Sequence, residues 1–395
     1  MTSVGGGITR ESADVAIVGG GVPGLVLAAE LARQSPKCEI VVVERAARDA
    51  AIGRGVLVHP VTQQLLEHFG LAVPGGPQDG RVERLEEYRD GEWLGSFDVV
   101  QRTGSGAEYA PRNIGLDPIR EVVRAAFDGR PRCRTWHETM VEEVRRDSAG
   151  WHLRVKGPDG PGELSCRVVV GAEGRESMVR EAGSIPATAV EFPGQVDVMA
   201  VPKRRPGPPT ISMSVGGREA TTVVDNGAGP NTLLFDMRPG GRAIDLDDRG
   251  LRPAVRERAA QAGLHLPPEA TPLFTTTLRS ATVRCDAWYR DGLLLLGDAA
   301  HAMHNLGGQG FNIGVQNAVA LARHLGTLLA TGDETDLREF ESWRLPYVTA
   351  LQDSQDEFFH GLAEGRLTGS SWFEQLHASL AFGQRGLWSA LTEES

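Results

Sequence analysis

Short, continuous apolar runs recur along this chain and define the first elements that its sequence predicts. Residues 15–18 and 40–43 are uninterrupted apolar runs, the pattern of strands that are buried on both faces of a parallel sheet. Residues 25–32, between them, have helical character, and residues 166–170 and 293–296 are further runs of the same kind. Because these runs are distant in the sequence, they predict a parallel sheet assembled from several parts of the chain.

Other periodicities fill the segments around these runs. Residues 62–69 and 117–127 show the apolar spacing of amphipathic helices. Residues 82–110 alternate between polar and apolar positions, and Asp90-Gly91 fits the turn of a hairpin within them. Further strands are predicted at residues 139–146 and 151–156.

The character of the sequence changes between residues 185 and 277, where Pro and Gly are frequent and the apolar runs are short and alternating. This pattern predicts a mostly antiparallel sheet, with one short helix at residues 253–262. From residue 310 to the end the chain is largely helical in pattern, with interruptions expected at Gly332 and Pro346.

Together these elements predict an α/β fold in which a Rossmann-like domain holds an inserted, mostly antiparallel β-sheet domain and is followed by C-terminal helices. The apolar stretch 15–31 is long enough to suggest a membrane span, but its glycines and Pro23 break it into strand, turn and helix. The expected division is a disordered leader (1–12), the Rossmann-like domain (13–80, 111–184 and 286–330), the inserted sheet domain (81–110 and 185–285) and C-terminal helices (331–395).

Composition narrows the class of protein. The chain has 395 residues, enough to bury a large core, and its hydrophobic and charged fractions are ordinary for a soluble globular protein. A formal net charge of -11 argues against nucleic acid as a partner and against stable attachment to an anionic membrane. The four cysteines lack the spacing of a zinc site or a disulfide framework, which favours a reducing, cytoplasmic location.

The first apolar run leads into Gly19, Gly21 and Gly24, which have G-x-G-x-x-G spacing and precede the predicted helix. In such a turn the first glycine permits a tight bend, the second lets a pyrophosphate approach the backbone, and the third lets the helix pack on the strand. The helix N-terminus offers its free N–H groups to the phosphates. Glu44 ends the second run, twenty residues past Gly24, where a ribose-binding acid is expected. The turn therefore predicts binding of an adenosine diphosphate group.

Two later motifs follow apolar runs in the same way. Gly-Ala-Glu-Gly stands at residues 171–174, and Gly-Asp-Ala-Ala-His at residues 297–301, before a glycine-rich segment at residues 306–312. In order and spacing, the three motifs resemble those of the group A flavoprotein monooxygenases, the para-hydroxybenzoate-hydroxylase-like family. The resemblance covers about residues 13–325. It implies an FAD-binding domain, a sheet-based substrate domain and no separate domain for NAD(P)H.

The resemblance also implies a set of cofactor-binding residues. Asp298 ends a buried run, where its carboxylate can accept hydrogen bonds from the ribityl hydroxyls of FAD. Gly307, Gly308 and Gly310 free the backbone before a helix, so that N–H groups can face the flavin and stabilise the negative charge that it gains on reduction. The expected cofactor-binding residues are Gly19, Gly21, Val22, Pro23, Gly24, Glu44, Arg45, Arg54, Glu173, Gly297, Asp298, Gly307, Gly308, Gln309, Gly310 and Asn312.

The chain departs from the family pattern at four positions. Glu173 stands where the second motif usually has aspartate, and Asn305 stands where proline is frequent beside the flavin. Leu116 occupies a place where arginine or glutamine is frequent, and a nearby arginine could substitute for it. Asn317 replaces the usual aspartate of the helix that follows the glycine-rich segment.

The motifs by themselves identify no catalytic residue. His304 and Asn305 are the candidates, because they stand together just before the glycine-rich segment. His301 matches a frequent residue of the family with a packing or hydrogen-bonding role. No carboxylate or cysteine accompanies these histidines at the spacing of metal ligands, so no metal site is expected.

The activity that the resemblance implies is that of an FAD-dependent monooxygenase that uses NADPH or NADH and O₂. Oxygen transfer through a flavin C4a-hydroperoxide would hydroxylate or epoxidise an aromatic or polyketide-like small molecule. Two alternatives stay open: a non-oxygenating flavin oxidoreductase of the same fold, and a non-catalytic interaction protein. The halogenase signature W-x-W-x-I-P is missing. The sequence does not indicate an oligomeric state.

Aromatic residues gather in the C-terminal segment. Packing of terminal helices against the nucleotide-binding domain would explain them. Alternatively, part of the set closes over a bulky apolar substrate, and Phe358 and Phe359 are the candidates because the segment before them is polar. The aromatic residues from residue 343 onward are Trp343, Tyr347, Phe358, Phe359, Trp372, Phe373, Phe382 and Trp388.

Overall fold

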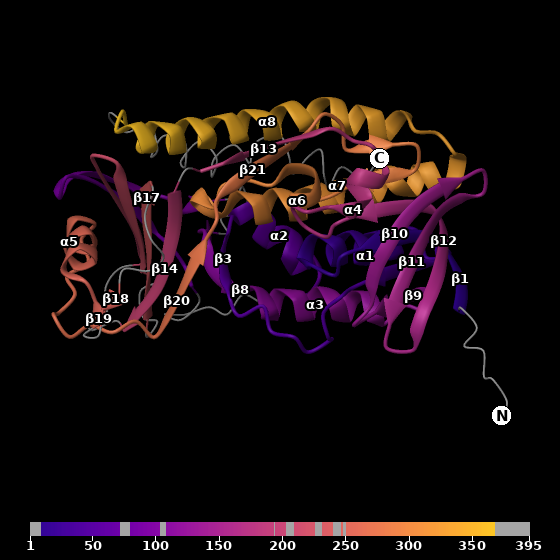
Figure 1. The fold of residues 1–395 in the computed structure, drawn as a ribbon, viewed down its shortest axis with the longest axis horizontal. Helices are drawn as coiled ribbons and strands as arrows, with labels where there is room; N and C mark the ends of the chain where they lie inside the picture. The colour runs from indigo at the N-terminus through magenta and orange to yellow at the C-terminus, as the bar shows by residue number, and fades with distance from the viewer. Residues whose placement is uncertain are drawn as a thin grey trace.

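Two β-sheets lie at opposite ends of an elongated molecule, and helix α8 (Thr335–Glu364) runs along one side past both (Figure 1). The structure is a computed structural model, and it describes residues 9–71, 80–102, 108–192, 194–202, 209–225, 231–239, 246–247 and 250–367. The first eight residues of the predicted leader and the aromatic residues Trp372, Phe373, Phe382 and Trp388 lie outside these ranges.

The first sheet is the predicted parallel sheet. Its eight strands run in the order β10-β11-β12-β1-β2-β9, and β23 and β22 extend it beside the end of β12. The pairs β1–β12, β1–β2, β2–β9 and β12–β23 are parallel, whereas β10 and β11 form an antiparallel hairpin beside β12. The strands are β1 (Thr9–Val18), β2 (Ile40–Val43), β9 (Cys133–Trp136), β10 (Met140–Asp147), β11 (Gly150–Gly157), β12 (Gly160–Gly171), β22 (Tyr289–Arg290) and β23 (Leu293–Leu295).

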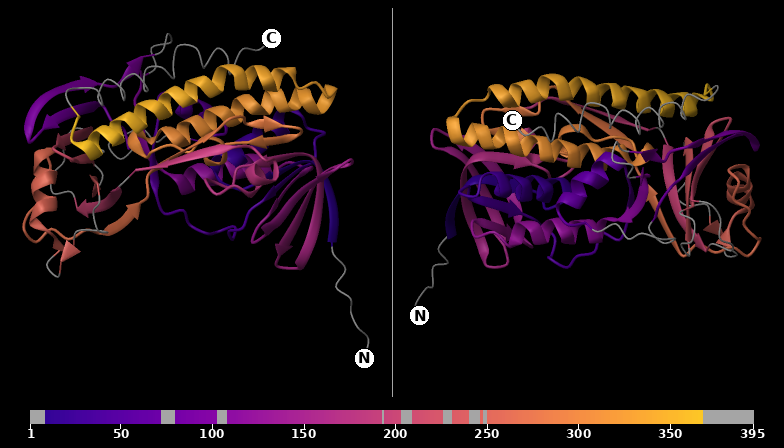
Figure 2. Two further views of the ribbon diagram at one scale, coloured as in Figure 1. Left: turned by 45° about the horizontal axis from the view of Figure 1, so that its top comes forward. Right: turned by 180° about the vertical axis from the view of Figure 1, so that it is seen from behind.

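Helices bury the first sheet. The apolar runs of β1, β2 and β23 are almost completely inaccessible, and they form one core with residues of α1, α3 and α7. Helix α1 packs against both α3 and α7, and α8 lies over α7 (Figure 2). The helices are α1 (Val22–Gln34), α2 (Pro60–His68), α3 (Leu116–Asp128), α4 (Met178–Ala182), α5 (Pro253–Gln261), α6 (Asp298–His301), α7 (Gln309–Thr331) and α8, with a 3₁₀ turn η1 (Leu306–Gly308) before α7.

The second sheet is mostly antiparallel, as predicted, and has the order β20-β14-β17-β16-β15-β4-β5. Only the pair β15–β4 is parallel among its described pairs. The hairpin β4–β5 turns at Asp90 and Gly91, both with positive φ, and joins this sheet to strands more than a hundred residues later. The strands are β4 (Arg84–Arg89), β5 (Glu92–Asp98), β14 (Gly194–Pro202), β15 (Thr210–Gly216), β16 (Glu219–Asp225), β17 (Asn231–Pro239) and β20 (Phe274–Leu278).

Both faces of the second sheet are covered. On β14, Val198 belongs to a core that includes the end of α8, whereas its neighbour Met199 belongs to a core that includes α5. Adjacent strand residues point to opposite faces, so α8 and α5 cover opposite sides of this sheet. Among the described residues there are also four two-stranded ladders: β3 (Gly55–Val58) with β8 (Arg112–Gly115), β6 (Gln101–Arg102) with β7 (Glu108–Tyr109), β13 (Ala187–Glu191) with β21 (Ala281–Cys285), and β18 (Leu246–Asp247) with β19 (Gly250–Leu251).

Two sequence predictions about element boundaries are wrong. The disordered leader was expected to reach residue 12, but β1 begins at Thr9 and pairs with β12 along its whole length. The first residues of β1 are polar because this end of the sheet is accessible to solvent, so its strand pairing needs backbone hydrogen bonds and no apolar side chains. The strand also gains a contact between Glu11 and Arg134 of β9.

Pro346 does not interrupt the C-terminal helix, contrary to prediction. Helix α8 continues from Thr335 to Glu364 with Pro346 inside it. Pro346 and Ser342, whose carbonyl loses its helical partner, are both exposed, so water can hydrogen-bond that carbonyl. Packing of buried residues on both sides of the proline, such as Phe340 and Val348, stabilises the continuous helix. Gly332, in contrast, ends α7 in a left-handed conformation, as predicted.

Candidate cofactor-binding site

The carboxyl ends of four parallel strands meet at one row of the first sheet. Val18 of β1 lies opposite Val43 of β2 and Gly171 of β12, and Gly171 lies opposite Leu295 of β23. The residues that follow each strand therefore emerge along the same edge. This register brings together the three glycine-containing motifs, which are separated by more than a hundred residues in the sequence. Ligands of open α/β sheets bind at this edge.

The glycines of the first turn have distinct surroundings. Gly19 has a φ of 108°, and a Cβ there would lie 2.4 Å from the Ala172 carbonyl oxygen. A Cβ on Gly24 would lie 2.3 Å from the Gly19 carbonyl oxygen. A Cβ on Gly21 would meet no described atom within 4 Å. Gly19 and Gly24 are thus required by the protein itself, whereas Gly21 leaves space in front of the N-terminus of α1.

Glu44 follows β2 and reaches back to the glycine turn. Its Oε2 accepts a hydrogen bond from the Gly20 N–H at 2.6 Å, and its Oε1 accepts one from the Ala46 N–H at 2.7 Å. The side chain is half-buried. Since an ionised carboxylate can accept about four hydrogen bonds, two positions stay available to the hydroxyls of a ribose. Arg45, the next residue, is exposed.

We predict that Glu44→Ala weakens binding of FAD by about 10- to 100-fold, because the ribose hydroxyls lose charge-assisted hydrogen bonds. Fluorescence titration of the apoprotein with FAD measures this affinity, and circular dichroism reports the fold. Glu39→Ala is the matched control, because this half-buried glutamate immediately precedes the opposite end of the same strand. Wild-type FAD affinity in Glu44→Ala would remove Glu44 from the site.

Asp298 stands at the same edge, as the first residue of α6 after β23. Its side chain is reached by solvent, yet the protein crowds it enough for desolvation to raise its pKa, and the charges of Arg175 and Arg54 oppose this shift. Among the described residues its carboxylate has no hydrogen-bond partner. A Cβ on Gly310 would lie 3.7 Å from its Oδ1, so Asp298 faces the glycine-rich segment. Pro23 of α1 packs beside Gly297 and fixes the spacing between the two turns.

Asn312 holds the glycine-rich segment in place. Its Nδ2 donates to the carbonyls of Leu57 and Gly308, both at 2.8 Å, and its Oδ1 accepts from the His59 N–H at 2.8 Å. Gly307 and Gly308 both have a φ of 68°, a conformation that favours glycine. Because Asn312 is completely buried, the structure assigns it to the support of the turn, behind the surface that a ligand would meet.

His59 supports the turn from the other side. Its Nε2 donates to the Gly307 carbonyl oxygen at 2.9 Å, and burial lowers the pKa of its ring from 6.5 to about 4. The folded protein therefore holds this ring neutral at neutral pH. The sequence motifs do not indicate this role of His59, although its place before Pro60 at the start of α2 is visible in the sequence.

The depressed pKa of His59 predicts acid lability. Below pH 6.5 the unfolded chain binds a proton that the folded protein takes up only near pH 4, so stability falls with pH over that interval, by about 3 kcal/mol in full. In His59→Gln the glutamine amide can still donate to Gly307, and we expect a shallower loss of thermal stability between pH 6.5 and 4. The matched control is His68→Gln, the same change at an exposed histidine of α2. Identical pH profiles for all three proteins would contradict this role of His59.

The other predicted site residues differ in where their side chains are directed. The Oε1 of Glu173 accepts from the Val179 N–H at 2.9 Å and the Ser177 hydroxyl at 2.8 Å, so its carboxylate is directed to the start of α4. Its Oε2 is buried without a partner, and desolvation raises the pKa of this carboxyl. Arg54 is exposed, Val22 is buried in the first turn of α1, and Gln309 is buried at the start of α7.

The segment around Leu116 is organised by its neighbour Asp117. The Asp117 carboxylate accepts hydrogen bonds from the backbone of Ile52 at 2.8 Å and of Gly53 at 3.0 Å, and these bonds lower its pKa. Arg120 donates to Asp117 at 3.0 Å and also to the Ala50 carbonyl. Asp117 thus holds the loop that carries Arg54. This role of Asp117 is not visible in the sequence, because the contact spans more than sixty residues.

His301 lies in a buried network beneath the site. Its Nε2 accepts from the Asn317 Nδ2 at 2.9 Å, and burial lowers its pKa to about 3. The Oδ1 of Asn317 accepts from Arg344 Nε at 2.6 Å, and Gln316 Oε1 accepts from another Arg344 nitrogen at 2.9 Å. Arg344 is completely buried, and burial lowers its pKa to about 10. No carboxylate among the described residues pairs with this guanidinium, which lies over the Tyr347 ring.

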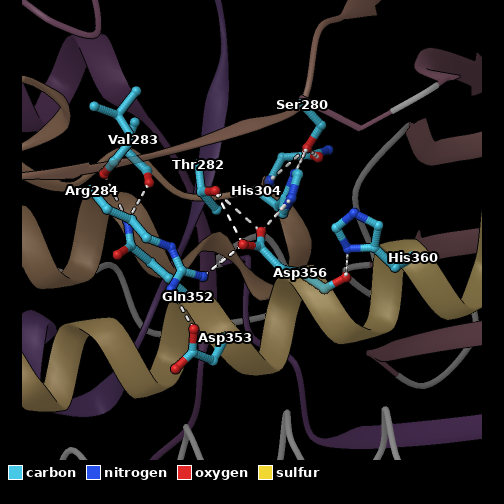
Figure 3. A network of polar contacts seen from close by, with 11 residues as sticks. Ser280, Thr282, Val283, Arg284, His304, Gln352, Asp353, Asp356 and His360 are labelled. Atoms are coloured by element: carbon cyan, nitrogen blue, oxygen red, sulfur yellow. Dashed lines mark hydrogen bonds and ion pairs between the residues drawn. The ribbon is translucent and has the colours of Figure 1, made fainter. Parts of the chain in front are cut away.

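The two catalytic candidates, His304 and Asn305, belong to a second polar network. Figure 3 shows His304 between Ser280 and Asp356 of α8 in this network. Phe359 stacks on the His304 ring, with ring centroids 4.2 Å apart. Phe358 and Phe359 are both about 1 % exposed and belong to the core between α8 and the second sheet. Packing therefore accounts for their burial, and it involves the second sheet as well as His304 of the nucleotide-binding part.

The edge fits a dinucleotide such as FAD. The N-termini of α1 and α7 begin at Gly21 and Gly308 without a side-chain cap, so their first N–H groups are available to an anion. The space at Gly21, the carboxylate of Glu44 and the unpartnered carboxylate of Asp298 add positions for phosphate and hydroxyl groups. No helix in the described part of the chain is long and apolar enough to span a bilayer.

Comparison with known proteins identifies the family. The family model described as "FAD binding domain" matches residues 12–355. Protoasukamycin 4-monooxygenase of Streptomyces nodosus is 27 % identical over 377 residues, which cover 90 % of this chain and 89 % of the relative. The 12-dehydrotetracycline 5-monooxygenase/anhydrotetracycline 6-monooxygenase of Streptomyces rimosus is 29 % identical over 361 residues, covering 86 % of this chain and 67 % of the relative.

Solved structures share the fold. PqsL of Pseudomonas aeruginosa, a probable FAD-dependent monooxygenase, superimposes with a TM-score of 0.74 at 24 % identity and covers 94 % of this chain and 100 % of that one. A ternary complex of aklavinone-11 hydroxylase with FAD and aklavinone has a TM-score of 0.71 at 21 % identity, covering 92 % and 72 %. The matching family model and the relatives together show that the chain belongs to the FAD-dependent monooxygenases that carry this FAD-binding domain.

Proposed function

We propose that this protein hydroxylates an aromatic, polyketide-like small molecule with O₂, using NADPH or NADH as the electron donor and FAD as the cofactor. The observation that carries the proposal is the common row of strand ends, which places Glu44, Asp298 and two uncapped helix N-termini at one edge. Two relatives, the first of them of matching length, have names that describe monooxygenation of protoasukamycin and of tetracycline precursors, and they support this substrate class.

The residues at the edge would hold FAD as follows. The α1 N-terminus and Gly21 would receive the pyrophosphate, and Glu44 would accept hydrogen bonds from the adenosine ribose. Asp298 would accept hydrogen bonds from the ribityl chain. The Gly307–Gly308 turn would direct the first N–H groups of α7 to the flavin, where they stabilise negative charge. When bound, FAD supplies the redox chemistry, taking electrons from NAD(P)H and activating O₂ for transfer of one oxygen atom.

We assign substrate binding to the second sheet. This sheet meets the nucleotide-binding part through α8 and the β13–β21 ladder, and its strands come from residues 84–98 and 194–278. The division of the chain into an FAD-binding domain, a substrate domain and C-terminal helices is part of this proposal. The net charge and the isolated cysteines support action in the cytoplasm on a small molecule.

The test is a turnover assay under ¹⁸O₂ with the purified holoenzyme, NADPH or NADH, and a panel of phenols and polycyclic aromatic polyketides. We expect the purified protein to show a bound-flavin spectrum, and at least one compound to gain one labelled oxygen atom. Oxidation of NAD(P)H that yields only hydrogen peroxide with every compound would contradict the proposed substrate class. Purified protein that binds no flavin would overturn the proposal as a whole.

A further inference from the structure

In the part of the chain that the structure describes, Arg344 of α8 is a buried cation without a carboxylate partner. Its side chain is 1 % exposed. Nε donates to Asn317 Oδ1 at 2.6 Å, and Nη2 donates to Gln316 Oε1 at 2.9 Å, so both acceptors are neutral amides. Nη1 is buried and has no hydrogen-bond partner among the described residues. The guanidinium charge is thus held in the protein interior without a described counterion.

Aromatic rings supply part of the stabilisation that a counterion would give. The guanidinium carbon of Arg344 lies 4.8 Å from the ring centroid of Tyr347 and 5.7 Å from that of Trp343. Such contacts attract a cation, but they leave its charge in place. Burial lowers the pKa of Arg344 to about 10, so the guanidinium is still protonated at neutral pH. The full positive charge therefore acts on its surroundings.

A carboxylate at position 317 would stabilise this guanidinium better than Asn317 does. Aspartate has nearly the same size as asparagine, and its oxygen would lie 2.6 Å from Arg344 Nε. A buried charge that lacks its partner is strongly destabilising, and natural proteins tolerate such violations mainly at functional sites. The neutral amide keeps the interior charge uncompensated at a cost in stability, which indicates that the charge has a function.

The charge of Arg344 acts on the motif that contains Asp298. Asn317 Nδ2 donates at 2.9 Å to Nε2 of His301, the last residue of α6. Burial lowers the pKa of the His301 ring to about 3, and the charge of Arg344 adds to that shift. Asp298 is the first residue of the same short helix. The field of the guanidinium therefore extends to the edge of the first sheet where we propose that FAD binds.

Helix α7 connects Arg344 to the same edge. Asn317 lies eight residues after Gln309, the first residue of α7, which corresponds to about 12 Å along a helix. Residues 312–318 of this helix are all buried, so water does little to screen the charge in this direction. The N-terminus of α7 is the positive end of the helix dipole, and the charge of Arg344 has the same sign. Both favour negative charge at the glycine-rich turn.

We propose that the uncompensated charge of Arg344 raises the reduction potential of FAD bound at this edge, and that Asn317 is a positioning residue that holds the guanidinium without neutralising it. Reduction by NAD(P)H transfers a hydride: FAD gains two electrons and one proton, NAD(P)H becomes NAD(P)⁺, and the flavin acquires negative charge. A buried positive charge lowers the free energy of this form relative to oxidised FAD. The inference rests on the proposed placement of FAD at this edge.

Redox titration of the FAD-loaded protein against reference dyes tests the proposal without substrate or turnover. We expect Asn317→Asp to lower the two-electron midpoint potential by about 30 mV, which corresponds to a tenfold change in the equilibrium between oxidised and reduced FAD. Arg344→Gln should lower the potential in the same direction, because it removes the charge that Asn317→Asp neutralises. A wild-type potential in Asn317→Asp would overturn the proposal.

Two further variants separate the charge of Arg344 from other causes. Gln316→Glu places a carboxylate on the same guanidinium but leaves the hydrogen bond between Asn317 and His301 in place, so it should also lower the potential. A shift in Asn317→Asp alone would assign the effect to the proton position on His301 and overturn the role of Arg344.

Arg338→Gln is the matched control for Arg344→Gln. Arg338 belongs to the same helix, but its side chain is 67 % exposed and pairs with Glu334, so solvent screens its charge. We expect this variant to keep the wild-type potential. Equal shifts in Arg338→Gln and Arg344→Gln would show that the net charge of the protein, and not the buried guanidinium, sets the potential, and would overturn the proposal.

The failure of this inference is distinguishable from the failure of the proposed function. The potential is measured on bound FAD in the absence of substrate, so unchanged potentials in the variants would contradict the role of Arg344 and leave oxygen transfer to an aromatic compound as proposed. The expected shifts in a holoenzyme that hydroxylates no compound would support the role of Arg344 and contradict only the proposed substrate class.

Discussion

A Gly21→Ala variant should fold as the wild type does and bind FAD at least a hundredfold more weakly, a loss of about 3 kcal/mol. The structure separates these two effects because a Cβ at Gly21 meets no described atom within 4 Å, and φ is −65° there, a value open to any residue. The added methyl group would occupy the space in front of the α1 N-terminus, which a pyrophosphate needs. Titration of the apoprotein with FAD, together with its melting temperature, measures both quantities.

Two other glycine variants serve as controls for Gly21→Ala. Gly95→Ala places a methyl group in similarly open space on β5, far from the turn, and should change neither FAD affinity nor apoprotein stability appreciably. Gly24→Ala should destabilise the apoprotein itself, because its Cβ would lie 2.3 Å from the Gly19 carbonyl oxygen. Wild-type FAD affinity in Gly21→Ala would mean that the phosphates do not approach this turn.

The first sheet could be predicted from the sequence because its strands are buried on both faces. Such strands are continuous apolar runs, and residues 15–18, 40–43, 166–170 and 293–296 all proved to be parallel strands of one sheet. The extension of β1 to Thr9 could not be predicted, because that part of the strand is held by its backbone pairing with β12 and is polar. Apolar residues in the sequence indicate which strands are buried. They do not indicate where a polar, solvent-accessible segment pairs with a neighbouring strand.

The candidate site likewise contains residues that the sequence could predict and residues that it could not. Residues that serve a local backbone requirement, such as Gly19 and Gly24 in the turn, are visible from spacing alone. Residues that act at long range are not: Asp117 holds the backbone at Ile52, and Asn312 holds Leu57 across 255 positions. Each uses an ordinary polar side chain whose role depends on register between distant elements. The sequence indicated a site at these motifs, and only the fold shows what supports it.

The hydrogen-bond partners of His304 could not be predicted from the sequence motifs. His304 and Asn305 were singled out by position, but their partners Ser280 and Asp356 lie 24 and 52 residues from His304. Helix α8 brings Asp356 to the glycine-rich segment because it continues through Pro346, where the sequence predicted an interruption. With the interruption that the sequence predicted at Pro346, nothing in the sequence would place Asp356 beside His304.

Asn317→Asp should raise the free energy of unfolding by about 3 kcal/mol, the lower part of the cost of removing one partner from a buried ion pair. Arg344 is completely buried, and its described hydrogen-bond partners are the neutral amides of Asn317 and Gln316. A carboxylate at position 317 would lie 2.6 Å from Arg344 Nε and complete the pair without a change of volume. Chemical denaturation at neutral pH measures the gain.

Gln316→Glu is the matched control for the second consequence of this change. Gln316 Oε1 also accepts from Arg344, at 2.9 Å, so a carboxylate there should stabilise the protein similarly. Only Asn317, however, donates to His301 Nε2. Asp at position 317 cannot donate, so His301 must move its proton from Nδ1 to Nε2, and the ¹⁵N shifts of its ring should exchange in that variant alone. Loss of stability in both variants would show that the Arg344 charge is already compensated, and unchanged His301 shifts in Asn317→Asp would remove Asn317 as the residue that fixes its tautomer.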